Sequence, residues 1–322
     1  MRTLPKAVAD YLGLRRNLGF KLHRYEAQLR QFLLFLKERR TSRITTKLAL
    51  EFATHGPQIS PKTALNRLAV VRGFARYRRS TDPSVEIPPC GLLPGKTERP
   101  RPYLYSQAEI DRLLQGAKDY PCWTRFPGPC WSRFQAWTFY CIFGLLVVTG
   151  MRVGEVLNLQ AADIDWGGAV LTIRNAKFGK SRLVPLHPST LKALATFVKH
   201  RDCFLAQLRP QPVPSHFFVT SRGTRLAITH VEQVFVCISR QIGLRGPKAN
   251  RGPRLHDFRH RFAIQTLLRW YRRGQPVDPL LPVLATYLGH TRLSGTYWYL
   301  DCTPELMAAA AQRLERRWKG VR

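Results

Sequence analysis

A proline-rich stretch at 81–102 constrains the fold of this chain of 322 residues more than any other sequence feature. Proline fixes the φ angle and lacks the backbone N–H that helices and sheets require. A single regular element therefore cannot cross the stretch, and we predict an extended linker between two domains. The prolines concerned are Pro83, Pro88, Pro89, Pro94, Pro100 and Pro102.

Residues 1–80 predict a small helical domain. Apolar residues recur at helical spacing along most of this region. Ser60-Pro61 places an N-cap serine before a proline at the first helical position, which is a strong start signal. The predicted helices span 4–18, 25–40, 45–53 and 60–77.

Residues 103–322 predict a larger, mainly helical domain. A capping box of Ser106 and Glu109 starts its first helix. The apolar run from Trp137 to Val148 is too short to span a bilayer and predicts a buried helix, whereas 119–131 predicts an irregular loop. Further helices are predicted to begin at Arg152 and to span 188–206, 229–242, 257–272, 278–288 and 304–317.

The hydrophobic period changes to that of strands between these helices. Short strands are predicted at Ile164, 169–174 and 182–186, and Phe217–Val219 can add another. Lys177 lies at the tip of the second predicted hairpin. The predicted fold class is therefore mainly α with a small antiparallel β-sheet.

The charge of the chain indicates a polyanionic partner. The sequence holds 52 Lys and Arg against 20 Asp and Glu, a formal net charge of +32 at pH 7. Residues 1–100 hold 20 of the basic and 7 of the acidic residues, so both domains are basic. Nucleic acid is the obvious polyanion. A membrane surface would also attract the chain, but the sequence has neither a basic amphipathic anchor nor a lipidation motif.

The cysteines indicate a reducing compartment. Seven occur, an odd number, and none forms a Cys-x-x-Cys pair. Free thiols fit this usage best, so we expect a cytoplasmic protein. His200 with Cys203, or Cys122 with Cys130, offers two zinc ligands, but neither pair has a matching second pair, and we expect no metal.

Four short motifs carry the chemistry. None is specific alone, but their order and spacing are specific as a set. Together they supply two arginines, one lysine, two histidines and a tyrosine. These are Arg152 after Thr149-Gly150, Lys177 in the hairpin, His256 and Arg259 in a His-x-x-Arg motif, His290 after Leu288-Gly289, and Tyr299 nine residues after His290.

This ordered set resembles the tyrosine recombinase (phage integrase) family. The resemblance implies a helical core-binding domain at 1–80 that binds DNA and an α+β catalytic domain at 103–322. It implies a site-specific recombinase or integrase of a mobile element, which cleaves and rejoins strands through a 3′-phosphotyrosyl intermediate. It also implies double-stranded DNA as the partner, a dimer to tetramer on that DNA, no cofactor, and the six residues above as the catalytic set.

The arginines and the tyrosine fit this chemistry on physical grounds. A phosphodiester is anionic, and its transition state spreads more charge over the non-bridging oxygens. The planar forks of Arg152 and Arg259 can each bind two oxygens, and His290 can add a hydrogen bond. A phenol with a pKa near ~10 leaves more readily than an aliphatic alcohol, which suits Tyr299 as a nucleophile that must later leave.

The remaining roles concern protons and support. Lys177 can protonate the departing 5′ oxygen, and His256 can accept the phenol proton or orient the phosphate. Glu155 and Asp257 can hold the cationic side chains in place.

Some residues have rivals. Lys180 competes with Lys177, although the distance to the Val-Pro-Leu strand favours Lys177. Tyr297 competes with Tyr299, although the spacing from His290 favours Tyr299. Arg152 can also form an ion pair with the nearby glutamate and do nothing else. His256 can cap the helix that it precedes, and His260 can be a core histidine.

Other functions fit part of the sequence. A type IB topoisomerase uses similar residues but reseals the same strand. A non-catalytic DNA-binding protein on the same fold, or an RNA-binding protein, fits the charge but not the complete set of site residues. Finally, Thr303 and Pro304 predict a C-terminal helix that docks on its own domain or, as the family resemblance suggests, on a neighbouring protomer.

Overall fold

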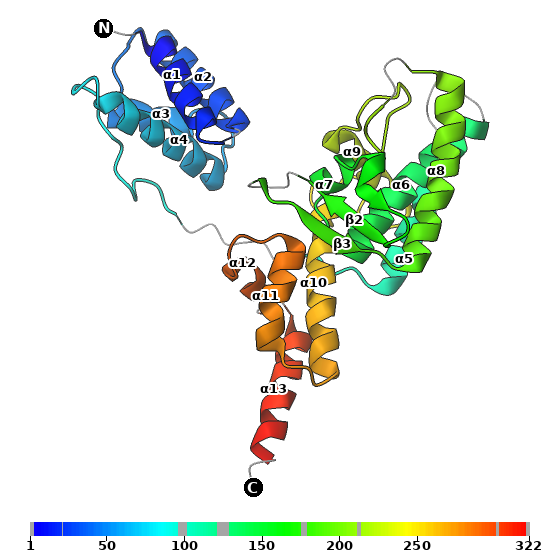
Figure 1. Ribbon diagram of the computed structural model, residues 1–322. Coiled ribbons are helices and arrows are strands. Elements are labelled where there is room, and N and C mark those ends of the chain that lie inside the picture. Colours follow the sequence, from blue (N-terminus) through cyan, green and yellow to red (C-terminus); the bar gives the residue numbers. More distant parts are fainter. Residues whose placement is uncertain are drawn as a thin grey trace. The chain divides into compact units, whose positions relative to one another are not determined.

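The computed structural model of the protein describes residues 3–20, 22–95, 102–120, 129–174, 179–210, 214–300 and 303–319 (Figure 1). The chain divides into two compact units, Met1–Pro100 and Arg101–Arg322. Each unit has an apolar core of its own.

The first unit consists of the four predicted helices. The start signals act as caps, because the Thr45 and Ser60 hydroxyls accept hydrogen bonds from backbone N–H groups three residues later. Aromatic side chains such as Phe32 and Phe74 are fully buried between the helices. The helices are α1 (Leu4–Asn17), α2 (His23–Glu38), α3 (Thr46–Thr54) and α4 (Pro61–Arg79).

The segment after α4 differs from the predicted extended linker at 81–102. Val85 is buried in the core of the first unit. Arg72 of α4 donates hydrogen bonds to the carbonyls of Pro88 and Pro89, both at 2.7 Å. Proline has no N–H that needs a partner, so side chains that bind carbonyls suffice to fix such a segment. Residues 81–95 therefore contain no helix or strand but pack on the first unit. Residues 96–101 lie outside the described residues, so the linker between domains stays a prediction.

The second unit contains a three-stranded antiparallel sheet in the order β1-β2-β3 (Figure 1). Leu171 of the middle strand pairs with Ile164 on one side and Val184 on the other, and all three are buried in the core. The predicted fold class, mainly α with a small antiparallel sheet, is confirmed. The strands are β1 (Ile164–Asp165), β2 (Val170–Ile173) and β3 (Arg182–Pro185).

The helices of the second unit lie close to the predicted ranges. They are α5 (Gln107–Lys118), α6 (Pro129–Thr149), α7 (Val153–Leu157), α8 (Pro188–Leu208), α9 (Ile228–Gln241), α10 (Leu255–Arg272), α11 (Val277–Leu288), α12 (Ser294–Tyr297) and α13 (Pro304–Lys319), with a 3-10 turn η1 (Ala161–Asp163) before β1.

Three details differ from the predictions. Helix α6 begins inside the predicted loop at 119–131, most of which lies outside the described residues. The one-turn helix α12 has no predicted counterpart. His216 and Val219 form isolated bridges in place of the strand predicted at 217–219.

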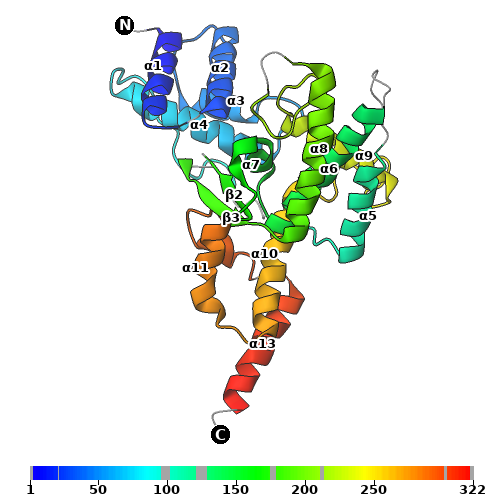
Figure 2. The same cartoon turned by 45° about the vertical axis from the view of Figure 1, so that its right-hand side comes forward.

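A second core in this unit joins α10, α11 and α13, which lie together below the sheet in both views (Figures 1 and 2). Ile264 of α10, Leu284 of α11 and Leu306 of α13 are buried in it, together with Tyr299. Arg313 fixes α13 further by donating to the carbonyl of Gln275 at 2.6 Å. The C-terminal helix therefore docks on its own unit through part of its surface. Among the described residues, none of the helices is both long and apolar enough to cross a membrane.

Candidate active site

Arg152 is placed by the turn between α6 and α7. Gly150 ends α6 in the left-handed region with φ +61°, and a Cβ there would come within 2.7 Å of the Phe262 ring. Glycine is therefore required at this position, because both the backbone conformation and the packing exclude a side chain. Arg152 follows as the N-cap of α7, and its backbone N–H donates to Glu155 at 2.9 Å.

Glu155 is the acidic group of the site. It accepts hydrogen bonds from Arg152 Nη1 at 2.7 Å and from Arg182 Nη2, also at 2.7 Å. Burial opposes ionisation of this carboxyl, but the hydrogen bonds from Arg182 and from the Arg152 backbone outweigh it and lower the pKa of Glu155 to about 2. The carboxylate is therefore charged at neutral pH, and its predicted role of holding site cations agrees with these contacts.

Arg259 of α10 is buried, with an exposed fraction of 2%. Its Nη1 donates to the carbonyl of Gly150 at 2.9 Å, and its Nη2 donates to the carbonyl of Leu288. Burial, and then the positive charge of Arg152, lower the pKa of Arg259 to about 10. The guanidinium is still protonated at neutral pH, so the site contains a desolvated positive charge.

The C-terminal end of α11 binds three guanidinium groups. Arg182 donates to the carbonyl of Tyr287 at 2.7 Å, Arg259 to that of Leu288, and Arg152 to that of Gly289 at 3.2 Å. The last carbonyls of a helix have no partner within it and carry the negative end of the helix dipole. Three consecutive residues at one helix end therefore bind arginines from the start of α7, from β3 and from α10.

His290 follows directly after this helix end. Gly289 makes the turn with φ +67°, and the Nδ1 of His290 hydrogen-bonds with the Thr296 hydroxyl at 2.8 Å. The ring would therefore meet a phosphate through Nε2. Burial, and then the charge of Arg259, lower the pKa of His290 to about 4. The imidazole is neutral at pH 7.

His256 lies near the start of α10 and is exposed, with its ring centroid 4.8 Å from that of His260. Desolvation by the surrounding protein, and then the charge of Arg259, lower the pKa of His256 to about 4, so the imidazole is neutral at pH 7. The predicted alternative that His256 caps this helix is wrong, because Asp257 accepts the N-cap N–H of Arg254. Asp257 thus holds Arg254, not the site arginines as predicted.

Tyr299 lies beside His290, with ring centroids 6.0 Å apart and planes 25° from parallel. It is 2% exposed, whereas Tyr297, the rival nucleophile, is 49% exposed. The His260 ring lies 5.5 Å from the Tyr299 ring and is itself buried, as predicted for a core histidine. The structure thus brings Tyr299, and not the exposed tyrosine, to the histidines of the site.

Lys177 lies outside the described residues, so its place relative to the phosphate site stays a prediction. Its rival Lys180 is described and exposed. The other five predicted site residues converge at the end of α11: Arg152, His256, Arg259, His290 and Tyr299.

This arrangement agrees with a family-level match. The Phage integrase family model matches residues 106–305, which is more than half of the chain. The chain belongs to this family.

The relatives support the same assignment. An integrase/recombinase of Sinorhizobium fredii is 48% identical over 320 residues, which is 99% of both chains. Among solved structures, the Tn1549 transposon integrase in complex with transposon right end DNA covers 98% of this chain and 99% of its own, at 16% identity and a TM-score of 0.67. A lambda integrase tetramer bound to a Holliday junction covers 94% and 78%, at 17% identity and a TM-score of 0.58. The protein is a tyrosine-type site-specific DNA recombinase.

Two residues at the recombinase site were not identified from the sequence. Thr296 hydrogen-bonds with His290, and Arg182 contacts both Glu155 and the α11 end. Arg182 opens a predicted strand, but nothing in its local sequence connects it with a glutamate 27 residues earlier. The signal appears only in three dimensions.

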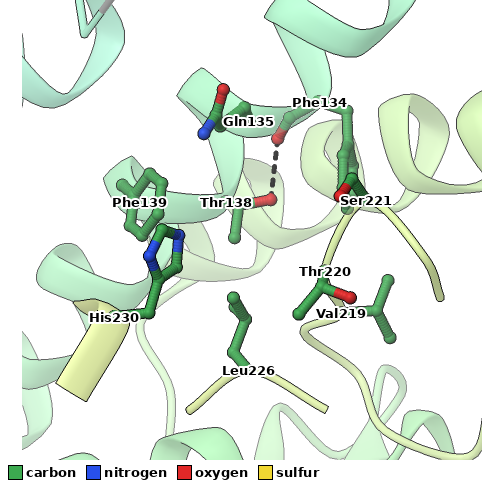
Figure 3. Close-up of a pocket in the computed structure, with 9 residues that line it drawn as sticks. All are labelled: Phe134, Gln135, Thr138, Phe139, Val219, Thr220, Ser221, Leu226 and His230. Atoms are coloured by element: carbon green, nitrogen blue, oxygen red, sulfur yellow. Dashed lines mark hydrogen bonds between the residues drawn. The ribbon is translucent and has the colours of Figure 1, made fainter. Parts of the chain in front are cut away.

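A separate cavity of about 130 Å³ lies elsewhere in the second unit (Figure 3). It is mainly apolar, with Phe134 and Phe139 of α6, Leu226, and His230 of α9 in its wall. It contains none of the predicted site residues, so it is not a substitute for the phosphate site. The described residues also hold no group of three His, Cys, Asp or Glu side chains placed to bind a metal ion.

Proposed function

We propose that this recombinase breaks a DNA strand by attack of the Tyr299 hydroxyl on a phosphate that Arg152, Arg259 and His290 hold. A bond forms between the phenolic oxygen and phosphorus, and the bond between phosphorus and the 5′ oxygen breaks. The product is a 3′-phosphotyrosyl ester and a free 5′-hydroxyl. A 5′-hydroxyl from a partner strand then reverses the reaction, so the ester conserves the bond energy and no cofactor is required.

The charge balance at the end of α11 is the observation that supports this proposal most. Arg152, Arg182 and Arg259 contribute three positive charges, and Glu155 contributes one negative charge. Both site histidines are neutral at pH 7. Two positive charges are left, which match the two negative charges of a phosphodiester under attack by a phenolate. Donors fixed in advance around developing charge are usually the largest catalytic contribution.

The proton transfers fit the remaining residues. His256 is neutral with a pKa of about 4, so it can accept the phenol proton. Lys177 then supplies the proton that the departing 5′ oxygen takes up. In this division the base lies on α10, and the acid belongs to the hairpin that the sequence predicts around Lys177.

We propose double-stranded DNA as the substrate, with two to four protomers assembled on it in the cytoplasm. The net charge of +32 supports a polyanionic substrate. The likeness to the transposon integrase and to the lambda integrase tetramer supports the setting of a mobile element and an oligomer on DNA. The first unit would then act as the core-binding domain, and the second as the catalytic domain.

A suicide substrate tests the nucleophile. The probe is a duplex selected from a randomised pool by binding to the full-length protein, with a nick a few nucleotides beyond each tested phosphate. The wild-type chain should form a covalent protein–DNA adduct that survives denaturation, and Tyr299→Phe should abolish the adduct while DNA binding is kept. Tyr297→Phe is the matched control and should keep the adduct. The reverse pattern in the two variants would show that the assignment is wrong.

A further inference from the structure

Arg182 reaches the site from β3 and uses all three guanidinium nitrogens. Nη1 donates to Glu155 Oε1 at 3.1 Å, and Nη2 donates to Oε2 at 2.7 Å. Nε donates to the carbonyl of Tyr287 at 2.7 Å. The side chain is 10% exposed. A planar group that binds a carboxylate with two nitrogens is held in one orientation, which a lysine cannot reproduce.

Arg182 and Arg152 share one carboxylate. Arg152 Nη1 also donates to Glu155 Oε1, at 2.7 Å, and its Nη2 turns away to the carbonyl of Gly289. Because Arg182 occupies the other carboxylate oxygen, Arg152 does not form the two-bond ion pair that would direct its whole fork toward Glu155. The Arg152 side chain is 25% exposed, more than that of Arg182, so part of it faces outward.

We propose that Arg182 is a positioning residue that neutralises Glu155 and so keeps the Arg152 guanidinium directed at the DNA phosphate. Without Arg182, the charge of Glu155 would face Arg152 alone and would draw its fork into an internal ion pair. Removing one partner of a buried ion pair leaves the other charge uncompensated. The Glu155 carboxylate would then attract the guanidinium of Arg152 more strongly. This inference rests on the proposed function, because it assigns Arg152 to the phosphate.

The same sheet offers a matched control pair. Arg174 follows β2 and forms an ion pair with Asp163, which is buried like Glu155. Asp163 also accepts the N-cap N–H of Gln160 at 2.9 Å, as Glu155 accepts that of Arg152. The two carboxylates are therefore bound in similar ways, although Arg174 is 57% exposed and Arg182 only 10%. The Asp163 pair contacts no predicted site residue in the described hydrogen bonds.

The experiment measures the single-turnover rate of covalent adduct formation with the same suicide duplex and saturating full-length protein. Arg182→Gln should slow the reaction about 100-fold, as expected when a catalytic group is displaced. Adding Glu155→Gln to Arg182→Gln should raise the rate about tenfold above that of Arg182→Gln alone, because it removes the uncompensated charge of Glu155. Arg174→Gln, alone or with Asp163→Asn, should leave the rate within about twofold. Thermal unfolding of all variants shows whether each is folded at the assay temperature.

The outcomes separate the two proposals. A folded wild-type chain that forms no adduct would overturn the proposed function and this inference with it. Adduct formation by the wild-type chain and by Arg182→Gln at equal rates would overturn the inference alone. A slow Arg182→Gln variant that Glu155→Gln does not relieve would also overturn it, because a purely structural role for Arg182 would not be relieved by removing the glutamate charge. A slow variant relieved by Glu155→Gln supports it.

Discussion

The arginines of the two units use the same chemistry in different surroundings. In the first unit, Arg72 donates to the carbonyls of Pro88 and Pro89 and is half-buried. In the second unit, Arg259 also donates to two carbonyls but is 2% exposed. The first arginine fixes a loop, whereas the second carries a charge in a place where water does not screen it. Burial, not hydrogen bonding, is what distinguishes these two arginines.

The strongest test of this difference between Arg72 and Arg259 is to change each of them to lysine. Arg259→Lys should lower the rate of adduct formation about 10³-fold, because an ammonium cannot replace a buried two-oxygen donor. Arg72→Lys should leave that rate within about twofold and lower the free energy of unfolding by about 1 kcal/mol. Suicide-substrate kinetics and chemical denaturation measure the two effects. Equal rate losses in both variants would remove the distinction.

A second test separates the arginines proposed to hold the phosphate from the proposed general acid, Lys177. Lys177→Ala should slow cleavage about 10²-fold. A substrate with a bridging 5′-phosphorothiolate has a leaving group that needs no proton, so it should restore cleavage by Lys177→Ala but not by Arg152→Ala. The same substrate tried with Lys180→Ala is the control. Rescue of Lys180→Ala in place of Lys177→Ala would move the acid three residues along the hairpin.

A third test concerns the part of α13 that its own unit leaves open. Leu306 is buried, but Leu314 and Trp318 are 48% and 67% exposed. If this surface contacts a neighbouring protomer, Leu314→Gln with Trp318→Gln should reduce cooperative assembly on two-site DNA about tenfold while single-site binding is kept. Gel-shift titrations with one-site and two-site duplexes measure both. Unchanged cooperativity would show that the helix serves its own unit only.

The smallest expected effect concerns pH. The folded pKa of His256 is about 4, below its ordinary value of 6.5. As pH falls from 6.5 toward 4, the unfolded chain takes up a proton that the folded chain does not, so this histidine contributes stability above pH 6.5 that is lost across that interval. His256→Gln should therefore lose less melting temperature between pH 7 and pH 5 than the wild-type chain. An NMR titration of His256 with a midpoint near 6.5 would show that the site is not desolvated.

Sequence reasoning succeeded where structure is local. The caps at Ser60 and Ser106 depend on neighbouring backbone groups, and both are confirmed. The spacing of apolar residues along the chain likewise predicted the fold class correctly. The first part of the predicted linker packs on the first unit through Arg72 and Val85, by contacts that no local pattern encodes.

The candidate site shows the same limit. The order of the motifs and their resemblance to the family predicted Arg152, Arg259 and His290 as site residues. It did not identify Arg182, whose role depends on a glutamate from another element, and it assigned Asp257 to the site although Asp257 pairs with Arg254. Residues proposed to bind the phosphate are predictable from sequence motifs, but residues proposed to orient them require coordinates.

The three carbonyls at the end of α11 belong to consecutive residues, so covalent geometry limits how far apart they can be. The distances between the three bound cations therefore depend little on how the surrounding apolar side chains pack. Substitutions in the core would move these charges together as a group and would seldom separate them. Such a site can tolerate extensive sequence drift in its scaffold, provided that this helix end and its glycine turn persist.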